Sequence, residues 1–217
     1  MFTVALHQFL RELGKNNNRQ WFTANKQRYE QHLLAPALEL VRAMAPRLAK
    51  LSKHLVADDR KVGGSMLRIY RDVRFGKDKR PYNEHVHFRF MHEKPGGLGY
   101  FLGVDNNEVT LGAGVWRPEP APLAAIRKAI AADCAGWRRA FGVKGWEPGG
   151  ETLARPPQGF EKDHTCISDI KRKDFVLFRK LKPTEAAKPG FVDTVAAGYA
   201  DTMPLIKFLA DALKLPL

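Results

Sequence analysis

The sequence predicts an α+β domain in which a central, mainly antiparallel sheet is flanked by N-terminal and C-terminal helices. Apolar residues recur at helical spacing near both ends of the chain, whereas two-residue alternation dominates between residues 66 and 116. The 217 residues, 44% of them hydrophobic, can bury roughly 70% of the surface that the unfolded chain exposes. No internal repeat divides the chain. We therefore expect one domain spanning residues 1–217.

The N-terminal region is predicted to be helical. Residues 3–13 carry apolar side chains at helical spacing and stop at Gly14, a residue suited to a helix C-cap. The three asparagines that follow supply a turn and an N-cap for the next helix. Helical spacing then runs from residue 19 to about residue 55, but Pro36 and Pro46 each remove a backbone donor. We expect a break near Pro36 and a kink or second break near Pro46.

Four consecutive segments are predicted to be strands. Residues 66–75 alternate between an apolar and a polar face, and residues 85–90 alternate again. The apolar face of the first segment comprises Leu67, Ile69, Val73 and Phe75. Residues 98–104 and 109–116 flank the polar run Asp105-Asn106-Asn107-Glu108, which indicates a hairpin with a four-residue loop. Strands that follow one another so closely favour an antiparallel sheet.

The third quarter of the chain is predicted to be a helix followed by an irregular connection. The helix runs from about residue 121 to residue 141 and could be interrupted around Asp133. Residues 142–160 contain eight Gly or Pro in nineteen positions. This composition indicates a long connection with at most a short strand around residues 152–155.

The C-terminal region completes the predicted fold. Residues 175–181 are predicted to be a late strand, and residues 191–213 a closing helix bent at Pro204. Helices at both ends around a central sheet define the α+β class.

The cysteines and the hydropathy pattern indicate a cytoplasmic protein with no membrane partner. The N-terminus lacks the basic segment of a signal peptide, and no window approaches the roughly 18 apolar residues of a membrane span. Cys134 and Cys166 are too few for a disulfide framework and form no C-x-x-C pair. We expect buried or incidental thiols. A Cys/His pair of Cys166 with His164 is the less favoured alternative.

Positive charge is concentrated in one segment. The chain has 36 Lys and Arg against 23 Asp and Glu, a net charge of +13. Residues 60–94 alone contain ten basic and four acidic residues, a net charge of +6. An excess that is local favours a discrete anion site over a polynucleotide track.

A candidate site for a small anion lies within that segment. An alternating strand would place Arg68, Asp72 and Arg74 on one face, roughly 7 Å apart, where a carboxylate can orient two guanidinium groups. Such an array would clamp a phosphate or carboxylate, and the cations of the following loop would close over it. The alternative is an ion-pair network around Asp72 with solvated loop cations. The candidate ligand-binding residues are Arg68, Arg71, Asp72, Arg74, Lys77, Lys79, Tyr82, Trp116 and Glu119.

Trp116 and Glu119 are expected to form a wall of the same pocket. They follow the Gly112-Ala113-Gly114 stretch, whose small residues permit close approach of a ligand or another backbone. In this interpretation Trp116 stacks on the ligand and Glu119 orients a hydroxyl or an arginine. The alternative is a rigid hairpin exit with Trp116 in the core. The stretch is not a phosphate loop, because it lacks the Lys and Ser/Thr of that motif.

No metal or cofactor is predicted. His85 and His87 would share a strand face that can seat a metal ion, but no third ligand is evident and Arg89 on that face would repel a cation. The catalytic triad, zinc-protease and dinucleotide motifs are all missing from the sequence.

Several motifs together carry a resemblance to a known family. They are Asn16-Asn17-Asn18-Arg19-Gln20-Trp21-Phe22, the run from Arg68 to Phe75 with Lys77-Asp78-Lys79-Arg80-Pro81-Tyr82, the stretch from Gly112 to Pro120, and Arg155-Pro156-Pro157-Gln158-Gly159-Phe160. Over nearly its whole length the chain resembles the domain of unknown function 2461 family, conserved hypothetical proteins of bacteria and fungi. The resemblance implies no established reaction, ligand or catalytic residue.

Three classes of function remain compatible with the sequence. The first is an enzyme or sensor that binds a small anionic molecule through the arginines, Asp72, Trp116 and Glu119. The second is a nucleic-acid-binding protein that uses basic residues interleaved with aromatic ones. The third is an interaction module whose cationic surface meets an acidic protein.

Overall fold

The computed structural model describes residues 2–74 and 76–217. These described residues form an α+β fold, which confirms the predicted class. Their antiparallel sheet has the strand order β1-β2-β3-β5-β4. Its strands are β1 Val86–Met91, β2 Leu98–Val104, β3 Val109–Val115, β4 Glu147–Pro148 and β5 Phe175–Leu181.

The β2–β3 hairpin confirms the clearest strand prediction. Its strands pair from Leu98 with Val115 to Val104 with Val109. The side chain of Asp105 holds the loop, since its Oδ1 accepts the backbone N–H groups of Asn107 and Glu108 at 2.6 and 2.9 Å. The local pattern therefore fixes both the strands and their turn.

The N-terminal helices follow the predicted region with different breaks. They are α1 Val4–Lys15, α2 Arg19–Ala24, α3 Lys26–Tyr29 and α4 Ala35–Leu51, with a π-helical turn η1 at Glu30–Leu34. Asn18 caps α2 as expected, because its Oδ1 accepts the Trp21 N–H at 2.9 Å. The expected break at Pro36 is wrong: the wider turn η1 changes the hydrogen-bond register just before the proline. Helix α4 continues through Pro46 without a break.

The C-terminal helices show the predicted interruptions. They are α5 Pro120–Ala132, α6 Cys134–Phe141, α7 Ile167–Ile170, α8 Phe191–Asp201 and α9 Met203–Leu213, with a 3₁₀ turn η2 at Pro183–Ala187. Asp133 separates α5 from α6 and caps α6 through a 2.7 Å bond to the Gly136 N–H. Thr202 separates α8 from α9, with Pro204 in the first turn of α9. The connection at residues 142–160 is irregular as predicted, apart from β4 and a single bridge from Thr152 to Arg172.

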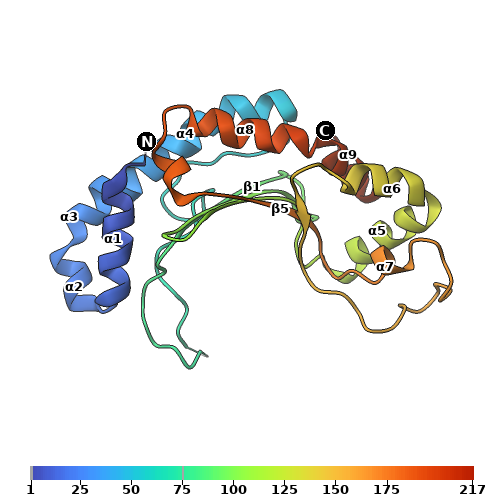
Figure 1. The fold of residues 1–217 in the computed structure, drawn as a ribbon, viewed down its shortest axis with the longest axis horizontal. Helices are drawn as coiled ribbons and strands as arrows, with labels where there is room; N and C mark the ends of the chain where they lie inside the picture. Colours follow the sequence, from blue (N-terminus) through green and yellow to red (C-terminus); the bar gives the residue numbers. More distant parts are fainter. Residues whose placement is uncertain (1, 75) are drawn as a thin grey trace.

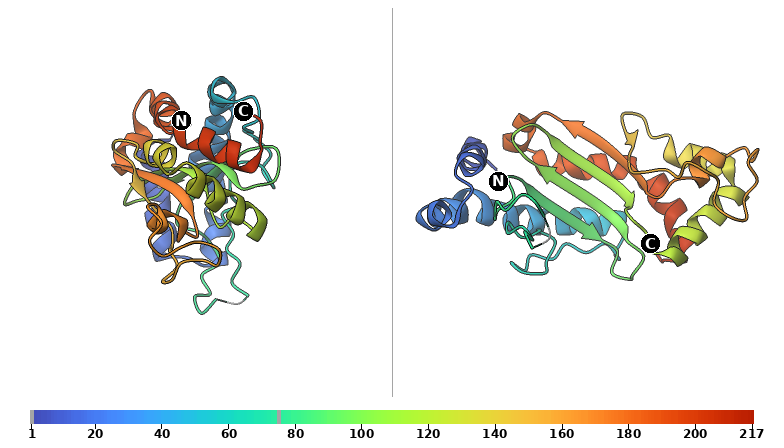
Figure 2. Two further views of the ribbon diagram at one scale, coloured as in Figure 1. Left: turned by 90° about the vertical axis from the view of Figure 1, so that its right-hand side faces the viewer. Right: turned by 90° about the horizontal axis from the view of Figure 1, so that it is seen from below.

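Helices cover one face of the sheet and leave the other face open. Helices α4 and α8 lie over the upper face in Figure 1, and α9 lies beside α6 and packs against β2 and β3. On this face the buried residues Phe88, Leu102 and Leu111 are neighbours in register. Seen from below, the strands have no helix in front of them (Figure 2, right). Helices α1–α3 lie beyond one end of the sheet and α5–α7 beyond the other. The open face of the sheet therefore lies between two groups of helices.

The predicted strand at residues 66–75 is wrong. Among residues 66–74, only Met66 and Tyr70 form bridges, Met66 to Phe88 and Tyr70 to Tyr82. The segment leaves β1 and doubles back on residues 81–83, where Pro81 has no N–H to extend the ladder. Phe75, expected on the apolar face, lies outside the described residues. We call the described residues 60–74 and 76–84 the basic arm; they project below the sheet in Figure 1.

A disulfide bears on the predicted compartment. Cys134 and Cys166 form a disulfide, with 5.8 Å between their Cα atoms, so the prediction of free thiols is wrong. The fold brings the start of α6 to the start of α7, although the two residues are 32 positions apart. None of the helices in the described ranges is both long and apolar enough to cross a bilayer.

Candidate functional site

The open face of the sheet carries the outward half of each alternating strand. One row across it runs from Arg89 on β1 through Phe101 on β2 and Gly112 on β3 to Phe178 on β5. On the opposite face the neighbours of these residues are buried in the core. The open face is therefore where the strands present side chains that the core does not use.

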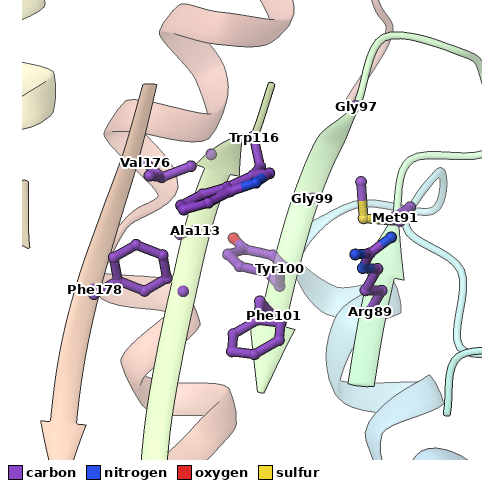
Figure 3. A pocket seen from close by; sticks show the side chains of 12 residues that line it. Arg89, Met91, Gly97, Gly99, Tyr100, Phe101, Ala113, Trp116, Val176 and Phe178 are labelled. Carbon is purple, nitrogen blue, oxygen red and sulfur yellow. The ribbon is translucent and has the colours of Figure 1, made fainter. Parts of the chain in front are cut away.

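An aromatic groove lies on this face. It has a volume of about 350 Å³. Its lining comprises Arg89, Met91, Gly97, Gly99, Tyr100, Phe101, Gly112, Ala113, Gly114, Trp116, Val176 and Phe178. Figure 3 shows Trp116 and Phe178 on one side of the groove and Arg89 and Met91 on the other. The rings of Trp116 and Phe178 meet edge to face at 5.9 Å, and Trp116 is 48% exposed.

Glycines determine the shape of the groove. A Cβ atom at Gly112 would lie 2.8 Å from the ring of Phe178, and one at Gly149 would overlap the same ring. The Phe178 ring therefore lies flat against the backbone only because both positions lack a side chain. Gly114, which has φ +128°, also lines the groove, and a Cβ atom there would overlap the backbone of Phe175 on the neighbouring strand.

A basic hollow adjoins the aromatic groove. It has a volume of about 480 Å³. Its lining comprises Lys61, Val62, Gly63, Gly64, Met66, Leu67, Arg68, Tyr70, Arg71, Asp72, Asn83, His85 and His87. The two cavities touch through a ring contact, because the centroid of His87 lies 4.9 Å from that of Phe101. The two cavities thus adjoin at His87 and Phe101, with the cations of the arm on one side of this contact and Trp116 on the other.

His85 and His87 form a stacked pair in the basic hollow, with ring centroids 3.6 Å apart. Burial is the largest of the effects that lower the pKa of His87 to about 4; the nearby His85 and Arg89 act in the same direction and Asp105 in the opposite one. Burial also lowers the pKa of His85. Within the described ranges no ring nitrogen of the pair has a hydrogen-bond partner. The pair is neutral near pH 7 and able to accept a proton or donate a hydrogen bond.

Three of the residues predicted to bind a ligand meet in the basic hollow: Arg68, Arg71 and Asp72. Asp78 holds Arg71 through a 2.7 Å ion pair. Both oxygens of Asp72 accept from Arg74, at 2.9 and 2.7 Å, and these bonds, with the charge of Arg68, lower the pKa of Asp72. Asp72 is thus anionic and already paired, as the ion-pair alternative anticipated.

The other predicted site residues lie elsewhere. Lys79 donates to the carbonyl of Val73 at 2.9 Å and so ties the arm together, and Lys77 is exposed and lines neither cavity. Tyr82 is buried and stacks on Phe22 with ring centroids 4.0 Å apart. These contacts make Tyr82 an anchor of the arm.

Trp116 and Glu119, which were expected beside the arginines, are separated from them. Trp116 lines the aromatic groove, while Arg68 lines the basic hollow. Glu119 is exposed at the start of α5 and lines neither cavity. In the described part of the chain the predicted residues therefore do not share one pocket, and some of them line two adjoining cavities.

Phe101, Phe178 and Arg89 line the groove but were not predicted from the sequence as site residues. The alternation of residues 85–90 already placed Arg89 opposite the core, and the same rule applied to residues 98–104 would have placed Phe101 there. Phe178 had no such signal, because its position depends on the pairing of β3 with β5, which are some 60 residues apart.

In the described part of the chain, no three His, Cys, Asp or Glu side chains are grouped to hold a metal ion.

The neutral state of His87 predicts a specific pH dependence of stability. Because its pKa is about 4 in the folded protein and 6.5 for an unperturbed histidine, the unfolded chain binds more protons between these values. The stability associated with His87 is complete above about pH 6.5 and is lost as the pH falls to 4, a change of about 3 kcal/mol. Denaturant unfolding at pH 7, 5.5 and 4 would measure it.

The matched variants are His87→Gln and His32→Gln. The first removes the titrating ring and should flatten the slope between pH 6.5 and 4, whereas the second changes a histidine outside both cavities. An identical slope in wild type and His87→Gln would show that His87 is not the residue responsible.

These observations define a class of protein: an α+β domain whose uncovered sheet face carries adjoining aromatic and cationic cavities. The family model described as "Conserved hypothetical protein (DUF2461)" matches residues 5–208. The chain belongs to this family, as the resemblance of its motifs indicated. No curated protein matches the chain.

Proposed function

We propose that the protein binds a small anionic ligand, bearing phosphate or carboxylate, in the basic hollow. The observation that carries the proposal is the state of Arg68. This exposed side chain lines the hollow and, among the described residues, is not within ion-pair distance of a carboxylate. A guanidinium that is not already neutralised is available to an external anion.

The surroundings of Arg68 support the proposal. Asp78 fixes the guanidinium of Arg71, which lines the same hollow, so its position is set before any ligand arrives. Asp72 adds little competing negative charge, because Arg74 already occupies both of its oxygens. The neutral histidine pair adds hydrogen-bonding groups that do not repel an anion.

Nucleic acid is the alternative ligand, and one observation favours it. Exposed aromatic side chains on an open sheet beside basic residues can stack successive bases. Against it, several cations of the arm are paired internally, including Arg71 and Arg80 with Asp78. A steep loss of oligonucleotide affinity with increasing salt would favour this alternative over a small ligand.

The cytoplasmic location expected from the sequence stays a prediction. Disulfides are rare in cytosolic proteins, where thiol buffers keep cysteines reduced. The bond between Cys134 and Cys166 therefore argues for an oxidising environment or for a bond that resists reduction.

Replacement of Arg68 is the test of the anion site. We expect inorganic phosphate or pyrophosphate to raise the thermal unfolding midpoint of the wild type, since a ligand that binds only the folded state stabilises it. In Arg68→Gln the affinity should fall roughly 10- to 100-fold, the equivalent of about 1.5–3 kcal/mol for a hydrogen bond to a charged group. Calorimetric titration would give the two dissociation constants.

The matched control is Arg139→Gln, which removes the same charge from an exposed position on α6 outside both cavities. It should leave phosphate affinity within about twofold of wild type, the size of a long-range charge effect. Equal losses in the two variants would mean that net charge, and not the basic hollow, attracts the anion.

A further inference from the structure

The aromatic groove and the basic hollow are parts of one surface, but the proposed function uses only the basic hollow. The groove is largely apolar and has aromatic side chains from three different segments: Phe101 on β2, Phe178 on β5 and Trp116 after β3. Apolar concave surfaces of this size that are next to fixed charges are typical of ligand sites. We therefore expect the groove to bind an apolar or aromatic group of a ligand.

We infer that the aromatic groove holds a planar aromatic ring of the same ligand whose phosphate occupies the basic hollow, so that the ligand is a nucleotide. The inference rests on the proposed function and adds the class of ligand. A nucleotide joins a flat aromatic ring system, whose faces stack on aromatic side chains, to an anion through a sugar. This order of groups matches the order of the two cavities along β1, from the histidines to Met91.

The spacing along β1 fits this ligand. His87, Arg89 and Met91 share one face of the strand, with successive side chains roughly 7 Å apart. His87 belongs to the basic hollow and Met91 to the aromatic groove, so the two ends of the surface are separated by roughly 13 Å. A sugar would lie between them, over Arg89.

Arg89 gives the junction its charge. Its exposed guanidinium lines the groove, and within the described part of the chain it forms no hydrogen bond or ion pair. From this position it can contact the phosphate or lie against the face of an aromatic ring. A purely apolar ligand would leave this cation unpaired, which is why charge complementarity favours an aromatic phosphate over a lipid-like or peptide occupant.

The floor of the groove suits a flat ring. Gly99, Gly112 and Gly114 leave the centre of β2 and β3 without side chains, and Phe178 is held flat by the glycines beneath it. Trp116 stands above this floor with about half of its surface exposed. A ring entering the groove would cover the exposed part of Trp116, as stacking requires.

The test compares inorganic phosphate with the four nucleoside 5′-monophosphates by calorimetric titration. At least one nucleotide should bind the wild type tenfold or more tightly than phosphate, because stacking adds to the contacts of the anion. In Trp116→Ala and in Phe178→Leu this gain should fall to less than threefold, while phosphate affinity stays within twofold of wild type. Arg68→Gln should weaken phosphate and nucleotide alike.

The outcomes separate the two proposals. If phosphate binds and no nucleotide binds more tightly, the nucleotide inference is overturned and the anion site stands. If the nucleotide gain survives in both aromatic variants, the ring does not lie in the groove and the inference is again overturned. If neither phosphate nor any nucleotide binds, the proposed function itself fails.

The two aromatic variants are expected to fold, so that a loss of binding can be assigned to the groove. Trp116 is half exposed, so its truncation removes little core packing, and Phe178→Leu retains an apolar side chain in the groove. Val4→Ala, at a position that is 71% exposed on α1, serves as the control for removal of a surface apolar group. It should leave every dissociation constant unchanged within twofold.

Discussion

Reduction of the disulfide between Cys134 and Cys166 is expected to lower the free energy of unfolding by about 3–4 kcal/mol. The bond closes a loop across 32 positions of sequence, and a loop of this length restricts the unfolded chain by about that amount in the chain-entropy treatment. Denaturant unfolding with and without a thiol reductant would measure the difference. A shift of this size is a large fraction of the stability of a typical domain.

The control for this prediction is the double variant Cys134→Ala with Cys166→Ala. It should unfold at the stability of the reduced wild type and should not respond to reductant. If the oxidised and reduced wild type unfold at the same denaturant concentration, the bond contributes nothing to stability.

The loop closed by this bond also contains a part of the site. Gly149, which makes room for the ring of Phe178, lies between the two cysteines in the sequence. Its backbone is tied to β5, since the Gly149 N–H donates to the Val176 carbonyl at 3.0 Å. Hydrogen bonds, and not the disulfide, therefore set the position of Gly149. Reduction should lower stability more than it alters the groove.

The parts of the fold that could be predicted from the sequence are those determined by local patterns. The hairpin of β2 and β3 needs only alternation and the polar loop at Asp105, which lie within twenty residues of each other. Residues 66–74 have similar alternation, but their backbone pairs only with residues 81–83 and with the edge of β1. A strand pattern without a partner along its length does not become a sheet strand.

The same distinction holds for the candidate site. Arg68, Arg71 and Asp72 lie within five residues, so their proximity follows from local sequence, although the predicted strand would have placed Arg71 on the opposite face. Trp116 and Phe178 meet only because β3 pairs with β5 across a long connection. The disulfide was missed for the same reason, since no local signal shows that two cysteines far apart in sequence will lie side by side.

Replacement of Gly114 on β3 is expected to cause the second large loss of stability. In Gly114→Ala the new Cβ would overlap the carbonyl oxygen of Phe175, and the backbone has a φ of +128° that residues with a side chain rarely adopt. The atom in the way belongs to the paired strand β5, so relief requires β3 and β5 to separate. We expect a loss of about 3 kcal/mol or more in the free energy of unfolding.

Gly112→Ala is the matched variant, and it should separate stability from binding. Its Cβ would lie 2.8 Å from the ring of Phe178, a side chain that can turn aside, and φ is not in the left-handed region. The cost to stability should stay near 1 kcal/mol, but the displaced ring would enter the groove and weaken nucleotide binding without affecting phosphate. If Gly112→Ala unfolds as readily as Gly114→Ala, the groove is too tightly packed to admit a ligand. If it binds nucleotide as well as the wild type, the ring of Phe178 does not border the occupied space.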